Sequence, residues 1–177
     1  MKKISSDLKV EGLSDEERAL RRRLQDARSE AISFLGLAKK PSGRVAQRLR
    51  DEGYDDDIVR EVVRELADEG YLDDLAIARR QARQRRGRQA ESHFALRQRL
   101  LQSGLAHDAV DTALDETLTD RELARDLLDT RFTPELKHLR AADTPPAEKR
   151  RLFMRIARLL GSRGFDSELI EELLRRH

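Results

Sequence analysis

The chain has 177 residues, of which 40% are charged, 38% hydrophobic and only 4% aromatic, and its 36 basic and 34 acidic side chains leave a formal net charge of +2. No apolar run reaches the roughly 18 residues of a membrane-spanning helix, which excludes a membrane-spanning protein. The absence of Cys excludes disulfide scaffolds and Cys-ligated zinc sites. We expect a highly charged, mostly helical protein of one or two domains.

The first predicted element is an N-terminal arm over residues 1–26, either helical or flexible. Ser14, Asp15 and Glu17 are typical of a helix start, because Ser caps a helix and acidic residues favour its first turn. The residues that follow are too highly charged to bury much surface. No apolar stretch follows the lysines at the start of the arm, and together with the lack of Cys this predicts a cytoplasmic location.

Three segments follow the arm and share one pattern, in which a helix ends at a Gly that precedes a large apolar residue. The glycines are Gly53, Gly104 and Gly164. When the segments are aligned on them, apolar residues coincide four and eight positions before the Gly and six and ten positions after it. A Gly directly after a helix supplies the left-handed conformation that closes it, and the spacing marks one apolar face. The segments cover residues 27–72, 73–118 and 119–177.

Each segment contains a leading amphipathic stretch, a helix, a Gly turn and a second helix. The leading stretches are residues 29–38, 74–86 and 119–131. The predicted fold is therefore all-α: an elongated, curved array of three tandem three-helix repeats. Pro134, Pro145 and Pro146 fall in the third repeat, where we predict a surface loop over residues 132–147.

Charge alternates in blocks along the repeats. Residues 51–74 carry eleven acidic and two basic side chains, whereas residues 75–104 carry eight arginines and a single acid, Glu91. Blocks of this kind form charged patches on the surface. The neutral total therefore hides a second repeat that is strongly basic.

The arginines of the second repeat are the first candidate binding residues. With about 100° per residue, Arg79, Arg83 and Arg86 cluster on one side of a helix whose other side is apolar. Because acids are scarce nearby, their charges are not neutralised by neighbours on the same helix. The set comprises Arg79, Arg80, Arg83, Arg85, Arg86, Arg88, Arg97 and Arg99.

A second, weaker basic face follows the predicted loop of the third repeat. It comprises Lys149, Arg150, Arg151, Arg155, Arg158 and Arg163. For both faces the alternative interpretation is a solvated charged surface without a partner. As binding surfaces, they would suit a phosphate backbone or an acidic protein groove. Aromatic residues are nearly absent from both, so sequence-specific reading of single-stranded bases is not expected.

Motifs for catalysis are missing from the sequence. It has no phosphate-binding glycine loop, no Cys nucleophile and no Ser in a GxSxG turn. The histidines are scattered without metal-ligand spacing, and the acidic runs at residues 55–57 and 73–74 stand where helices begin, which favours capping over a cation site. We predict no enzymatic activity, no cofactor and no bound metal.

One short string of residues is more specific than the rest of the sequence. Gly70, Tyr71, Leu72, Asp73 and Asp74 precede an arginine-rich helix that runs toward Gly104. This arrangement, and the flanking Gly53-Tyr54 and Gly164-Phe165 turns, resembles the RecX family over about residues 29–175. The resemblance implies an all-helical array of three three-helix repeats.

The resemblance also implies a function. RecX-type proteins bind the groove of the filament that the RecA recombinase forms on single-stranded DNA, and they mostly inhibit its ATPase, strand-exchange and co-protease activities. The implied partners are this filament and, more weakly, single- or double-stranded DNA, with no membrane and a monomeric protein. The alternatives are a general nucleic-acid-binding module like a helix-turn-helix protein, acting through phosphate contacts, and a helical scaffold without nucleic acid.

Overall fold

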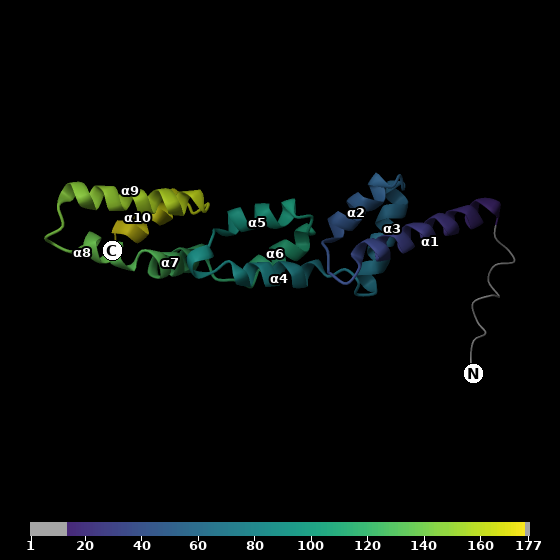
Figure 1. Cartoon of the computed structure of the whole chain (residues 1–177), viewed down its shortest axis with the longest axis horizontal. Helices are drawn as coiled ribbons and strands as arrows, with labels where there is room; N and C mark the ends of the chain where they lie inside the picture. Colours follow the sequence, from purple (N-terminus) through teal and green to yellow (C-terminus); the bar gives the residue numbers. More distant parts are fainter. Residues whose placement is uncertain (1–13, 176–177) are drawn as a thin grey trace, which may run out of the picture. The chain divides into compact units, whose positions relative to one another are not determined.

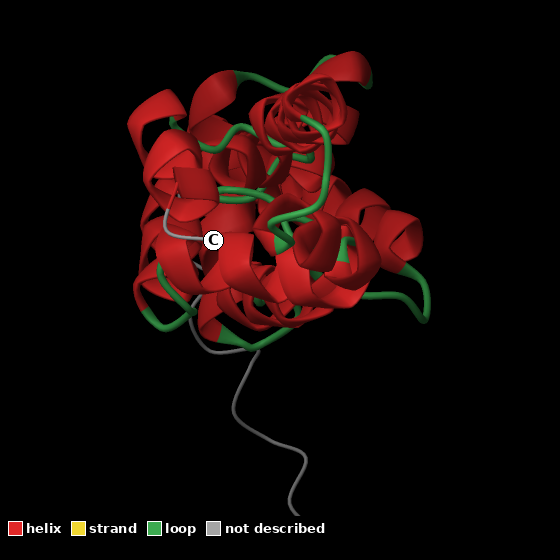
Figure 2. Cartoon of the chain, turned by 90° about the vertical axis from the view of Figure 1, so that its left-hand side faces the viewer, coloured by secondary structure: helices red, strands yellow, loops and turns green. Residues whose placement is uncertain are grey.

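The computed structural model describes residues 14–175, and every regular element in that range is helical (Figures 1 and 2). The all-α prediction is confirmed. The chain divides into two compact units, one that ends at Asp73 and one that begins at Asp74. No helix in the described range is long and apolar enough to cross a membrane. The first thirteen residues of the predicted arm lie outside the described residues.

The first unit contains α1 (Asp15–Leu35), α2 (Ser42–Asp51) and α3 (Asp56–Asp68), which all contact one another. Ser14 caps α1, because its hydroxyl accepts a hydrogen bond from Glu17 N while the Glu17 carboxylate accepts one from Ser14 N. The helix runs without interruption from the predicted arm into the first repeat. Its buried residues are Ala27, Ala31 and Leu35, and the core of this unit also takes in Leu49 and Leu66.

The second unit begins with α4 (Asp74–Gln84), a 3-10 turn η2 (Gly87–Gln89), α5 (His93–Gln102) and α6 (His107–Asp115). Helices α4 and α5 both pack on α6 around a small core of aliphatic residues. The buried Asp74 fixes Ala106, the residue directly before α6, because its Oδ2 accepts a hydrogen bond from Ala106 N at 2.7 Å. Asp74 therefore links the start of α4 to the start of α6.

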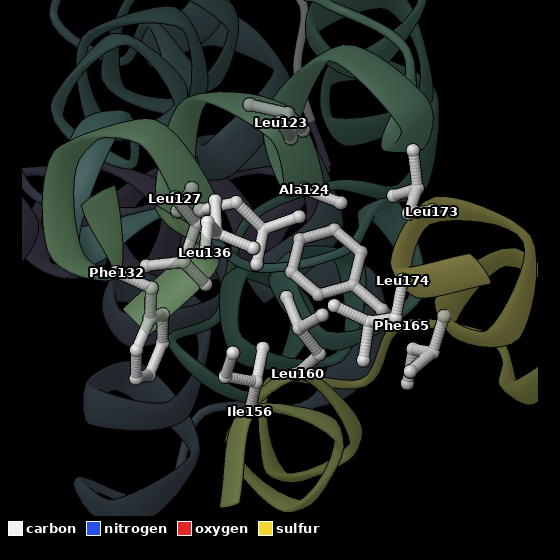
Figure 3. Packing of buried hydrophobic residues seen from close by; sticks show 13 residues of the cluster. Leu123, Ala124, Leu127, Phe132, Leu136, Ile156, Leu160, Phe165, Leu173 and Leu174 are labelled. Atoms are coloured by element: carbon white, nitrogen blue, oxygen red, sulfur yellow. The ribbon is translucent and has the colours of Figure 1, made fainter. Parts of the chain in front are cut away.

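The unit continues with α7 (Asp120–Arg131), α8 (Thr133–Arg140), α9 (Pro146–Ser162) and α10 (Ser167–Arg175). Their buried side chains converge on one core, in which Phe165 lies among leucines of α7, α9 and α10 (Figure 3). This core is the largest of the three and contains two buried phenylalanines, Phe132 and Phe165.

The prediction of a loop over residues 132–147 is wrong in part, because residues 133–140 form helix α8. Pro134 stands in the first turn of this helix, where proline is tolerated because the N–H groups there have no partner within the helix. Phe132 and Leu136 are buried and fix the helix to the core. The third predicted repeat therefore contains four helices rather than three, and only residues 141–145 separate α8 from α9.

The same turn closes α2, α5 and α9. In each, a glycine with positive φ follows the helix, and the next residue donates its N–H to a carbonyl five residues back: Tyr54 N to Leu49 O at 3.1 Å, Leu105 N to Leu100 O at 3.4 Å and Phe165 N to Leu160 O at 3.2 Å. This is the Schellman arrangement, which satisfies carbonyls at the end of a helix. The turn returns a large apolar side chain onto the helix that it closes.

One joint connects the two cores of the second unit. Ser92 caps α5, and its N–H donates to the carbonyl of Arg163 at 3.0 Å in the turn after α9. A Cβ on Gly164 would lie 2.6 Å from Ser92 Oγ and 2.8 Å from Ala95 Cβ, so only glycine fits there. Ala90, just before Ser92, is buried in the core of α7–α10. The segment between η2 and α5 therefore holds the two cores of the second unit together.

Candidate functional site

The exposed arginines of α4 and η2 form the first basic surface. Arg80, Arg83 and Arg86 recur every three residues and are exposed, as is Arg88 in η2. Among residues 14–175 none of these four has an ion pair or a side-chain hydrogen bond. We call these four residues the α4 surface. Their charges are available to an anionic partner.

The other four arginines predicted from this repeat are bound by acids. Arg79 is held by Glu116, with Nε 2.7 Å from the carboxylate, and Arg97 contacts both oxygens of Asp111 at 2.7 and 3.1 Å. These hydrogen bonds lower the pKa of Glu116 and of Asp111 below the ordinary range of carboxyl groups. Both acids lie in or directly after α6, more than ten positions away in the sequence. The acids that hold these two arginines therefore come from another element, which a search for acidic neighbours on the same helix does not detect.

Glu91 binds the remaining two arginines of this set, Arg85 and Arg99. Its carboxylate is only 2% exposed, and it accepts hydrogen bonds from Arg99 Nε at 3.0 Å and Nη2 at 2.7 Å, with Arg85 Nε at 3.4 Å. The bond to Glu91 raises the pKa of Arg99 further. A buried carboxylate needs such partners because an unpaired charge is costly away from water. Arg85 and Arg99 therefore act as structural residues that fix the joint at Ser92.

The second basic face lies on α9. Arg150, Arg151, Arg155 and Arg158 are exposed on one side of the helix, and Ile156 and Leu160 are fully buried on the other. The exposed stripe lines an open furrow of about 650 Å³ whose walls are Pro146, Ala147, Arg150, Arg151, Met154, Arg155 and Arg158. Arg155 lies 3.4 Å from Glu135 of α8. Arg150, Arg151 and Arg158 have no ion pair within the described range.

A second depression continues this furrow toward α7. It shares Arg155 and Arg158 with the first and adds Arg131, Phe132, Leu159 and Ser162. We call the two depressions together the α9 furrow. Sequence reasoning missed Arg131, which comes from another helix and carries no local signal. It also missed Met154, which is 53% exposed and whose spacing of four residues from Arg150 and Arg158 places it on the same stripe.

Two residues of the predicted second face lie apart from it. Lys149 is half-buried and lines neither depression. Arg163 contributes its carbonyl to the joint with Ser92.

The described residues offer no candidate metal site. The histidine at position 93 is half-buried, with Nε2 2.8 Å from Leu118 O, and no group of three or more metal-ligating residues occurs between positions 14 and 175.

The string at residues 70–74 closes the first unit and opens the second. Gly70 has a φ of 80° directly after α3, Tyr71 is half-exposed, and Leu72 is buried in the first core. Asp73 pairs with Lys39 at 3.5 Å, and Asp74 has the capping contact with Ala106. Leu72 and Asp74 thus have structural roles, while the Tyr71 ring is exposed to solvent.

Comparison with known proteins assigns the chain to a family. The sequence model of a family described as DNA alkylation repair enzyme matches residues 7–144. The chain belongs to this family. Helix α9 lies beyond the matched residues, whereas Arg131 and Phe132 of the furrow lie within them. No curated protein matches the chain.

Two solved structures have the same fold over most of the chain. The structure of regulatory protein RecX has a TM-score of 0.66 and 19% identity, and covers 94% of this chain and 81% of that one. RecX from Lactobacillus salivarius has a TM-score of 0.65 and 15% identity, over 88% of this chain and 97% of that one. The chain thus has the RecX fold. The family description names an enzyme, whereas RecX is named a regulatory protein.

Proposed function

We propose that this protein is a RecX-like regulator that binds the RecA–single-stranded-DNA filament and mostly inhibits its ATPase, strand-exchange and co-protease activities. The observation that carries the proposal is the match to the RecX fold over 94% of the chain. The string at residues 70–74, which resembles the RecX family, supports it independently. The protein acts by binding, as a monomer in the cytoplasm, and needs no cofactor.

In this proposal, the α4 surface is the part of the protein that contacts nucleic acid. A filament on single-stranded DNA presents phosphates along its groove, and guanidinium groups form bidentate hydrogen bonds to phosphate oxygens. Arg80, Arg83, Arg86 and Arg88 meet this requirement because none of them forms an ion pair within residues 14–175. Arg83 interacts electrostatically with Glu116 without forming an ion pair. Arg79, which sequence reasoning places in the same set, is held by Glu116 and contributes less.

The proposal is tested by sedimentation of the protein with RecA filaments and by RecA-promoted strand exchange. We expect the wild-type chain to pellet with filaments and to reduce strand exchange. Arg80→Gln with Arg83→Gln should weaken both effects several-fold, since each solvent-exposed charge pair contributes about 0.2–1 kcal/mol. The matched control is Arg60→Gln with Arg64→Gln on α3, where both arginines already pair with acids of their own helix. A wild-type protein that neither pellets nor inhibits contradicts the proposal.

A second candidate function is action on DNA itself, and the family match over residues 7–144 favours it. In its simplest form the protein is a helical module that binds DNA phosphates without RecA. In its enzymatic form it would release alkylated bases. Incubation with methylated duplex DNA, followed by chromatography of the released bases, distinguishes the two forms. Under our proposal no base is released, and binding to naked DNA is weaker than binding to the filament.

A further inference from the structure

We propose that the α9 furrow docks a short acidic peptide segment of a partner protein, and that one large apolar side chain of this segment covers Met154. The inference goes beyond the proposed function, because it requires neither RecA nor DNA as the partner. It rests on three properties of the furrow, which are its unpaired charge, its apolar floor and its length.

The charge of the furrow calls for an anionic partner. Four of its five arginines, Arg131, Arg150, Arg151 and Arg158, lack an ion pair within residues 14–175. The fifth, Arg155, has only a 3.4 Å contact to Glu135. On α4 and α5, by contrast, four arginines are bound by acids. Guanidinium groups gathered on one open surface favour carboxylates or phosphates, which both accept two parallel hydrogen bonds.

The apolar floor selects a peptide over a nucleic acid. Met154 is 53% exposed between two pairs of arginines, and Leu159 continues the floor. A phosphate backbone would leave this apolar surface uncovered, whereas an apolar side chain flanked by carboxylates would fill it. Methionine adapts to ligands of different shape, and Met and Arg are both enriched at protein interfaces. Phe132, the aromatic residue of the furrow, is 3% exposed and so cannot stack on a base.

The length of the furrow matches a short extended segment. Its α9 wall runs from Pro146 to Ser162, which at 1.5 Å per residue spans about 24 Å. An extended peptide advances about 3.3 Å per residue, so roughly seven residues fill the furrow. One apolar residue near the centre of such a segment would reach Met154, and acidic residues on both sides would reach the arginines.

The direct test uses a fluorescein-labelled peptide of ten residues with Glu and Asp throughout and one central Phe. Fluorescence anisotropy measures its binding to the full chain. We expect Arg150→Gln with Arg151→Gln to weaken binding about tenfold, because two solvent-exposed charge pairs are lost. Met154→Ser should weaken it about threefold, since part of one apolar contact is lost. The same peptide with Ser in place of Phe should bind about fivefold more weakly.

The matched control is Arg80→Gln with Arg83→Gln, which removes two exposed arginines from the α4 surface of the same unit. These substitutions should leave peptide binding unchanged. A labelled single-stranded oligonucleotide of ten thymidines provides the competing ligand, and we expect the α4 substitutions, not the α9 substitutions, to weaken its binding. Circular dichroism checks that each variant keeps its helices.

Three results would overturn the inference. The first is a peptide that does not bind, and the second is binding that depends equally on the α4 and α9 arginines. The third is an oligonucleotide whose binding is lost with the α9 substitutions, which would assign the furrow to nucleic acid. None of these results touches the test with RecA filaments, so this inference and the proposed function fail separately.

Discussion

The two arginine-rich regions of the second unit differ in how their charges are satisfied. Between the start of α4 and the end of α5, acids hold Arg79, Arg85, Arg97 and Arg99, which are half of the eight arginines predicted to bind in this repeat. Along α9, Glu135 is the one acid among residues 14–175 that forms an ion pair with the exposed arginines, and an open furrow accompanies them. The region with the higher density of arginine in the sequence is thus the more neutralised in the structure. A count of charges along the sequence does not measure the charge available for binding.

The largest expected effect concerns the joint that connects the two regions. Gly164→Ala places a Cβ against Ser92 and Ala95 at a φ of 82°. We expect a loss of about 3 kcal/mol in the free energy of unfolding, because backbone strain and overpacking add together. Urea denaturation measures it. Gly53→Ala is the control, since its φ is also positive but its Cβ meets nothing within 4 Å. Equal losses in both variants would show that the joint carries no packing constraint.

The next effect tests whether Arg85 and Arg99 are structural. Glu91→Ala removes a buried carboxylate that both arginines contact, and we expect a loss of about 2 kcal/mol in the free energy of unfolding. The freed arginines should also raise the affinity for duplex DNA, which filter binding measures. Unchanged stability and unchanged DNA affinity would place Arg85 and Arg99 back among the binding residues.

The third effect separates the two basic surfaces by salt. If Arg80 and Arg83 contact phosphates, replacing both by Gln should reduce the slope of log K against log salt on single-stranded DNA by about 1.4. Replacing Arg150 and Arg151 should leave this slope unchanged. A titration with an oligonucleotide at several salt concentrations gives the slopes. Equal reductions in the two double variants would remove the distinction between the surfaces.

The smallest expected effect is a dependence of the thermal unfolding midpoint on pH. The bonds from Arg79 and Arg97 lower the pKa of Glu116 and Asp111 in the folded state. A lowered folded-state pKa stabilises the fold above the unfolded-state pKa, and this contribution is lost as the pH falls through the folded-state value. Thermal unfolding midpoints should therefore be level from about pH 7 to 5.5 and fall below about pH 4.5. Glu116→Gln should reduce the fall slightly, whereas Arg150→Gln should not change it.

Much of the fold follows from local sequence signals. The glycine turns after α2, α5 and α9, the capping at Ser14 and the start of α7 all depend on residues within one or two turns, so patterns in the sequence predict them. Helix α8 is not predicted, because the three prolines nearby indicate a loop. The helix is stabilised by the burial of Phe132 and Leu136 against residues distant in the sequence. The arrangement of the repeats along the chain stays a prediction.

The candidate site was less predictable for the same reason. Pairing depends on which acids the fold brings to each arginine, and Asp111 and Glu116 approach only because α4 and α5 pack on α6. The same applies to Arg131, which reaches the furrow from α7. A sequence pattern locates basic helices, but tertiary packing decides which of their charges remain available.

The most direct test of the account is the rate of DNA-dependent ATP hydrolysis by RecA filaments as this protein is added. We predict that the rate falls as the wild-type chain is titrated, that Arg80→Gln with Arg83→Gln shifts the titration to several-fold higher concentration, and that Arg60→Gln with Arg64→Gln leaves it in place. A rate that stays constant at every concentration of a folded wild-type chain would contradict the account.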